Sequence, residues 1–71
     1  MTNTKLLRDI IAESGIKYKS LAKSVGITPY GLQKKIDNDN QFKAGEILTL
    51  SDELGLTTRQ RDGIFFARQV E

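Results

Sequence analysis

The sequence Thr28-Pro29-Tyr30-Gly31-Leu32-Gln33-Lys34-Lys35-Ile36 predicts a short helix around which the rest of the chain is organised. Thr28 is a good N-cap, because its hydroxyl can accept a hydrogen bond from an amide that has no partner at a helix start. Pro29 suits the first helical position, where a missing N–H costs nothing. Leu32 and Ile36 are four residues apart, so they share one face and anchor the helix to a core.

The opposite face of this helix is polar. A step of about 100° per residue places Tyr30 and Lys34 opposite the apolar pair and Gln33 on the flank. Gln33 can read adenine through two hydrogen bonds, and Lys34 can contact guanine or a phosphate. Tyr30 can contact a phosphate or a thymine methyl group, or it can pack over the preceding turn. We expect this helix to be presented to a partner, although the same groups also occur on any solvated helix.

A second short helix precedes the first over about residues 18–25. Its apolar face includes the small Ala22, which lets a crossing helix approach closely. Gly26 suits the left-handed conformation that ends a helix, and Ile27 returns the chain to the core. Only Gly26 and Ile27 then separate this helix from the cap at Thr28. Two helices joined by so tight a turn must cross steeply, which is the helix-turn-helix arrangement.

Apolar periodicity elsewhere predicts three more helices. They run from a cap within residues 2–4 to Gly15, over about residues 43–54, and over about residues 57–67. A polar turn at residues 37–41 ends the presented helix. No stretch alternates between apolar and polar residues as a strand would. We therefore predict one all-α domain over residues 1–71, a compact five-helix fold with its helix-turn-helix over about residues 18–37.

Charge is unevenly distributed along the chain. The net charge is +2, but residues 1–35 hold seven basic and two acidic side chains, and residues 36–71 hold four basic and seven acidic ones. A basic half suggests a polyanionic partner, and two ordinary solvated faces are the alternative. We expect four lysines to attract such a polyanion without reading its sequence, namely Lys17, Lys19, Lys23 and Lys35. Others are interpreted as the solvated side of the first helix, namely Lys5, Arg8, Asp9 and Glu13.

Composition excludes several classes of protein. The 71 residues include no Cys and no His, so disulfides, Cys/His zinc sites, thiol nucleophiles and imidazole bases are absent. The turn Asp37-Asn38-Asp39-Asn40 lacks the glycine and later Glu of a calcium loop. No glycine loop for phosphates and no paired carboxylates occur, so we predict neither an enzyme nor a cofactor or metal site. With no secretory leader and no apolar run near the ~18 residues of a membrane span, we expect a cytoplasmic protein.

Residues 21–36, LAKSVGITPYGLQKKI, resemble the helix-turn-helix of the Cro/cI-type phage repressor superfamily. The small Ala22, the turn at Gly26 and the apolar Leu32 match its pattern. The chain over about residues 4–67 is also similar to small Cro-like proteins of phages of Gram-positive bacteria, through Gln41-Phe42, Glu46-Ile47, Leu54-Gly55-Leu56-Thr57 and Ile64-Phe65-Phe66. Some members of that group are Cro repressors, and others are modulators of repression, antirepressors that bind the phage's own repressor protein. The resemblance implies a transcriptional regulator of a lysis/lysogeny switch in a bacterial host cell, with double-stranded operator DNA as its partner.

This resemblance assigns roles to particular residues. Those matching the positions that meet base edges or phosphates in the major groove are Thr28, Tyr30, Gln33 and Lys34. Those matching the start of the second helix, which lies against the DNA backbone, are Lys17, Tyr18 and Lys19.

Three departures from the family pattern favour a second hypothesis. Lys17-Tyr18 stand where the family has a Thr or Ser cap followed by Gln, and Pro29 replaces a residue that could donate to DNA. Asp37 lies on the same side as Tyr30, where a carboxylate would repel phosphates. On this alternative the chain is an antirepressor that docks on the cognate phage repressor and binds DNA weakly or not at all.

An apolar surface is also expected far from the presented helix. Leu48 lies about 100° off the apolar stripe of its helix, and the neighbours Phe65 and Phe66 cannot both face inward. If Leu48 and one phenylalanine are exposed, they form a candidate interface with a partner, with homodimerisation as its first form. The alternative is that all of them belong to the core of this small domain.

Overall fold

Five α-helices make up the part of the chain that the structure, a computed structural model, describes, which is residues 1–66. They are α1 (Thr4–Ser14), α2 (Tyr18–Val25), α3 (Pro29–Ile36), α4 (Ala44–Leu54) and α5 (Thr58–Phe65). Residues 1–66 contain no strand, so the predicted all-α fold is confirmed. The helix predicted over about 57–67 ends at Phe65, and residue 67 lies outside the described residues. None of these helices has both the length and the apolar character needed to cross a bilayer.

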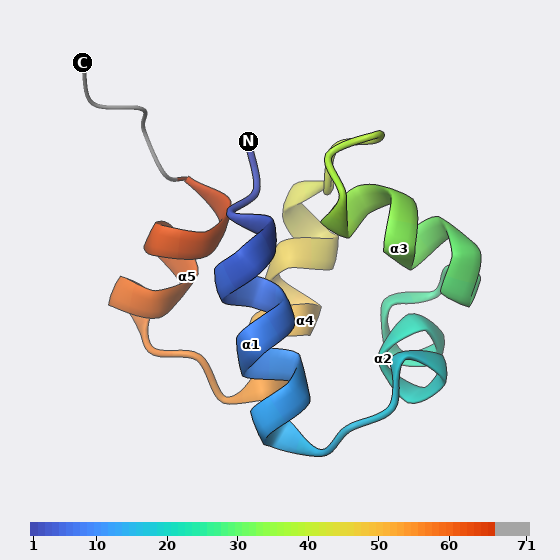
Figure 1. Cartoon of the computed structure of the whole chain (residues 1–71), viewed down its shortest axis with the longest axis horizontal. Coiled ribbons are helices and arrows are strands. Elements are labelled where there is room, and N and C mark those ends of the chain that lie inside the picture. Colours follow the sequence, from blue (N-terminus) through green and yellow to red (C-terminus); the bar gives the residue numbers. More distant parts are fainter. Residues whose placement is uncertain (67–71) are drawn as a thin grey trace.

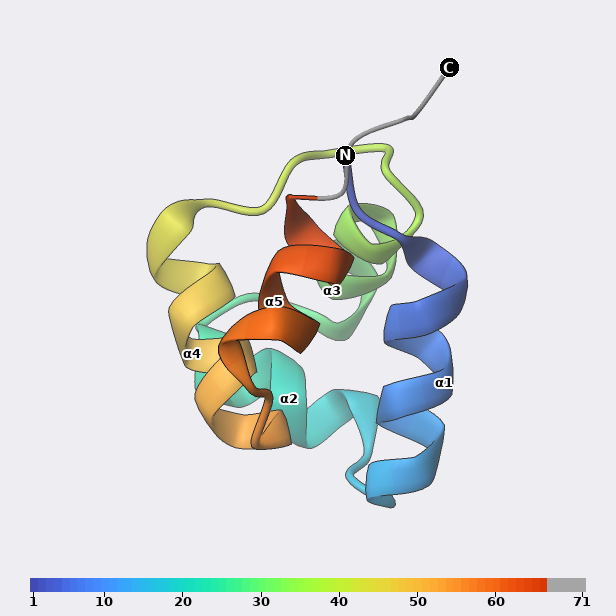
Figure 2. The same cartoon turned by 90° about the vertical axis from the view of Figure 1, so that its left-hand side faces the viewer.

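The helices are arranged in three parts (Figure 1). Helices α1 and α4 lie between α5 on one side and the α2–α3 pair on the other. The view turned by 90° shows α5 in front, with α1 and α4 on either side of it and α2 and α3 behind (Figure 2). The α2–α3 pair therefore forms one end of the molecule, and α5 forms the opposite end.

The core lies where the five apolar stripes meet. Its fully or almost fully buried residues are Leu7, Ile11, Leu21, Ala22, Leu32, Ile36, Ile47, Leu50, Ile64 and Phe65. The rings of Phe42 and Phe65 meet edge to face, with centroids 5.3 Å apart. Helix α3 contributes only Leu32 and Ile36 to this core, as its sequence predicted, and its other residues are half-buried or exposed.

The turn between α2 and α3 has the predicted chemistry. Gly26 adopts a left-handed conformation with φ of 86°, and its N–H donates to the Ala22 carbonyl at 2.9 Å. The Ile27 N–H donates to the same carbonyl at 3.0 Å. Thr28 then caps α3, because its hydroxyl oxygen accepts from the Gly31 N–H at 2.9 Å. Pro29 follows at the start of the helix.

Residues 2–4, here called the N-terminal strap, join the end of α3 to the end of α5. The Asn3 N–H donates to the Ile64 carbonyl at 2.7 Å, and the Thr4 hydroxyl donates to the Ile36 carbonyl at 2.5 Å. The side chain of Asn38 accepts from the Thr2 N–H and donates to the Thr2 carbonyl, each at 2.8 Å. Asn38 is left-handed, with φ of 67°, a conformation that Asn tolerates better than most residues. The polar turn after α3 therefore also holds the start of the chain.

Candidate nucleic-acid interface

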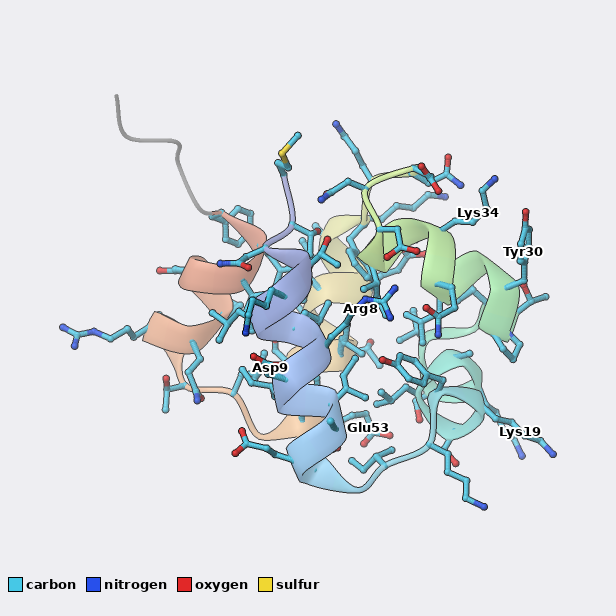
Figure 3. The ribbon with its side chains drawn as sticks, in the orientation of Figure 1. Arg8, Asp9, Lys19, Tyr30, Lys34 and Glu53 are labelled. Atoms are coloured by element: carbon cyan, nitrogen blue, oxygen red, sulfur yellow. The ribbon has the colours of Figure 1, made fainter. Side chains whose placement is uncertain are left out.

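The outer face of α3 carries an exposed aromatic residue and a lysine side by side. Tyr30 is 71% exposed, and the Lys34 ammonium nitrogen lies 5.3 Å from the centroid of its ring. Figure 3 shows Tyr30 and Lys34 projecting from α3, and Lys19 from α2, all away from α1 and α5. A contact of this kind between ammonium and ring is worth about 0.5–1 kcal/mol at an exposed site. Tyr30 does not pack over the preceding turn, the alternative considered from sequence.

The start of α2 lacks a side-chain cap, as the sequence indicated. Lys17 occupies the N-cap position and gives no side-chain hydrogen bond to the first turn. Lys17 and Lys19 are exposed, whereas Tyr18 is half-buried and packs against the core. Backbone amides at an uncapped helix start attract anions, and at the start of α2 two lysines lie close to these amides in sequence. Lys17 and Lys19 are thus accessible for the contact with the DNA backbone that the sequence predicts. The Tyr18 ring, in contrast, packs partly against the core.

Arg8 joins α1 to the end of α3, and its position was not predicted. Its Nη2 donates to the Asp37 carboxylate at 2.5 Å and to the Gln33 side-chain oxygen at 3.4 Å. The hydrogen bond to Asp37 raises the pKa of the Arg8 guanidinium, against the opposing effect of desolvation, and Tyr18 adds a smaller contribution. Arg8 therefore contributes to the end of α3, although its side chain is still 42% exposed. Its pairing with Asp37 also offsets the negative charge that was expected to repel phosphates.

Lys35 is held in an ion pair with α4 and is not available for diffuse attraction. Its ammonium lies 2.6 Å from a Glu46 carboxylate oxygen, and the two side chains are only 14% and 13% exposed. The same oxygen accepts from the Lys43 N–H at 2.8 Å, which satisfies the start of α4. Burial acts to raise the pKa of Glu46, but the hydrogen bonds from Lys35 and Lys43 outweigh it and hold that pKa below its usual value. Sequence reasoning missed this role because Lys35 and Glu46 meet only once α3 and α4 are packed.

Two of the three residues considered for the apolar surface are exposed. Leu48 and Phe66 are each 57% exposed, whereas Phe65 is 5% exposed and packs on Phe42. Of the two candidate phenylalanines, Phe65 is therefore wrong as an interface residue, because only Phe66 faces outward. A shallow apolar hollow of about 200 Å³ lies beside Leu48 and Phe66 and is also lined by Ala44, Ile47 and Arg61.

Comparison with protein-family models, with curated proteins and with solved structures finds no match for this chain. Within residues 1–66, no three His, Cys, Asp or Glu side chains are placed to hold a metal ion. The described surface thus offers two features for binding: the cationic and aromatic face of α2 and α3, and the apolar surface at Leu48 and Phe66.

Proposed function

We propose that this chain is a helix-turn-helix regulator of transcription that binds operator DNA by placing α3 in the major groove. The observation that carries this proposal is the contact between the exposed Tyr30 and the half-buried Lys34 on the outer face of α3, together with the exposed Lys17 and Lys19 at the start of α2. A helix anchored by only two buried residues leaves Tyr30 and Lys34 on its outer face, where they can meet base edges. The resemblance to Cro/cI-type phage proteins assigns this regulator to a lysis/lysogeny switch.

The electrostatics of this end of the molecule support DNA as the partner. Residues 14–36 include five lysines and no acidic residue, and four of these lysines remain when Lys35, which is paired with Glu46, is set aside. The nearest acidic residue in sequence after α3, Asp37, is paired with Arg8. A face with cations and few anions attracts the phosphate backbone, and its aromatic and amide groups can contact the groove.

A salt series of DNA binding tests the proposal. Fluorescence anisotropy with the intergenic DNA next to the chain's own gene should give nanomolar, sequence-selective affinity. For each tenfold increase in salt concentration, the logarithm of the binding constant should fall by about 0.9 for every phosphate that the protein contacts. Lys34→Ala should weaken operator binding by about 1–3 kcal/mol if Lys34 contacts a base. Arg59→Ala is the matched control, because it removes one exposed positive charge from α5 at the other end of the molecule. Binding that is micromolar, unselective and lost at physiological salt would refute this function.

A second function, an antirepressor that binds the cognate phage repressor, is favoured by one observation of its own. The apolar surface at Leu48 and Phe66 is exposed, and such a surface fits a protein partner and not a polyanion. The uncapped start of α2 and the proline at the start of α3 agree with a weaker DNA reader. Pull-down of the cognate repressor should then persist at high salt, because apolar contacts are not screened, and Leu48→Asp should abolish it. Absence of a complex at every salt concentration would refute this alternative.

A further inference from the structure

Gln33 in α3 and Asp37, the residue that follows the end of α3, are bridged by one side chain from α1. They stand four residues apart, and the Nη2 group of Arg8 donates to the Asp37 carboxylate at 2.5 Å and to the Gln33 side-chain oxygen at 3.4 Å. The shorter contact with Asp37 places the guanidinium so that it faces the Gln33 amide.

The chemistry of Arg8 decides which end of that amide faces outward. A guanidinium has only donors, so the atom of Gln33 that faces it must be the carbonyl oxygen. The amide nitrogen, which carries two hydrogens, is then the end of Gln33 that is left for a partner. Gln33 is half-buried, which restricts the side chain further.

From this geometry we infer that Arg8 is a positioning residue that makes Gln33 a donor-only reader, selective for guanine and against adenine. This inference rests on the proposed DNA-binding function. Recognition of adenine by glutamine needs the carbonyl oxygen to accept from the adenine amino group while the amide nitrogen donates to N7. With its oxygen turned toward Arg8 and its amide nitrogen turned away from it, Gln33 can instead donate to the two acceptors of guanine, O6 and N7. Adenine offers the Gln33 amide nitrogen only one acceptor, N7, because its other major-groove group is an amino group and is itself a donor. The adenine contact expected from sequence alone is therefore replaced by a guanine contact.

The orientation of Gln33 is tested first on the free protein by NMR of its side-chain amide. In the wild type, the Gln33 amide group should be as ordered as the α3 backbone. Arg8→Met keeps the aliphatic stem of Arg8 but removes its donors, so the amide of Gln33 should become mobile in this variant. Lys5→Met is the matched control, because it removes a charge from the same helix at an exposed pair with Asp9 and should leave Gln33 ordered. An amide that is mobile in the wild type, or that Arg8→Met does not change, would overturn the inference.

Base preference is tested with operators substituted one base pair at a time. Gln33→Ala identifies the base pair that Gln33 reads, as the position where base preference is lost. There the wild type should favour guanine over adenine by about tenfold, and Arg8→Met should move the preference toward adenine without altering it at other positions. Adding Arg8→Met to Gln33→Ala should change no preference further, because Arg8 acts through Gln33.

The outcomes separate this inference from the function on which it rests. Selective binding with an adenine preference in the wild type, or with no position sensitive to Gln33, overturns donor-only reading and leaves the DNA-binding function in place. Absence of any selective binding refutes the DNA-binding function and with it the guanine contact. A guanine preference that moves toward adenine only when Gln33 is present and Arg8 is absent supports the inference.

Discussion

Replacing Glu46 by Gln should destabilise the domain by about 2 kcal/mol at neutral pH, although it keeps the shape of the side chain. With the charged atoms of Lys35 and Glu46 2.6 Å apart, their attraction at an effective dielectric constant near 20 is about 6 kcal/mol. Most of it is offset by desolvation, because the two side chains are only 14% and 13% exposed. The net loss of stability on breaking the Lys35–Glu46 pair should therefore lie between the ~0–1 kcal/mol of a surface pair and the ~3–5 kcal/mol of a fully buried pair.

The choice of Gln separates the ion pair from the helix cap. The side-chain oxygen of Gln can still accept from the Lys43 N–H, the bond that Glu46 makes at 2.8 Å. Glu46→Ala removes this bond as well and should cost about 1 kcal/mol more. Urea unfolding followed by circular dichroism measures both variants. Asp9→Asn is the matched control, because it breaks the exposed Lys5–Asp9 pair and should cost less than about 0.5 kcal/mol.

The dependence of this loss on pH follows from the lowered pKa of Glu46. A carboxyl group whose pKa is lower in the folded state than in the unfolded state stabilises the fold above the unfolded-state value. That contribution is lost as the pH falls through the folded-state pKa. The difference between wild type and Glu46→Gln should therefore be complete at pH 7 and vanish in strong acid. A cost below about 0.5 kcal/mol at pH 7, or one independent of pH, would show that the pair does not hold α3 against α4 as the geometry requires.

Three further substitutions test other parts of the fold. Ser51→Ala should stabilise the domain by about 0.5–1 kcal/mol in urea unfolding, because the Ser51 hydroxyl is buried without a hydrogen-bond partner within the described residues; a loss of stability would reveal a partner. Gly26→Ala should cost about 1–2 kcal/mol, because its φ of 86° strains any side chain although nothing lies within 4 Å of an added Cβ, and an unchanged melting temperature would contradict this. Asn38→Gly keeps the left-handed turn but removes the bonds to Thr2, so amide hydrogen exchange at Thr2 and at Asn3 should accelerate; unchanged exchange would mean that the strap is held by other contacts.

The sequence was sufficient for the features that depend on near neighbours. The caps and stops at Thr28, Gly15, Gly26 and Gly55 are local, and the apolar stripes of the helices follow from spacing along the chain. These features determine the five helices and the tight turn between α2 and α3. They also place Tyr30 and Lys34 outward, because Leu32 and Ile36 must face the core.

The features that depend on how the helices pack could not be predicted. Arg8 lies beside the buried stripe of α1, but only the crossing of α1 over α3 brings it to Asp37 and Gln33. The pairing of Lys35 with Glu46 depends in the same way on the packing of α3 against α4. Spacing required one of Phe65 and Phe66 to face outward but did not say which one, and the contact with Phe42 selects Phe65 for the core. A charge can be assigned to solvent or to an ion pair only when its neighbours from other helices are known.

The N-terminal strap makes the fold close on itself, and this affects how the domain forms during synthesis. Residues 2–4 are made before α3 and α5, yet they bond to Ile36 at the end of α3 and to Ile64 near the end of α5. The strap therefore cannot be completed until almost all of the described chain has been made. Contacts between such distant parts of a chain form late in folding and slow it. The end of α3 is thus held by Thr4, and the neighbouring Asn3 is in turn held by Ile64, near the other end of the described chain.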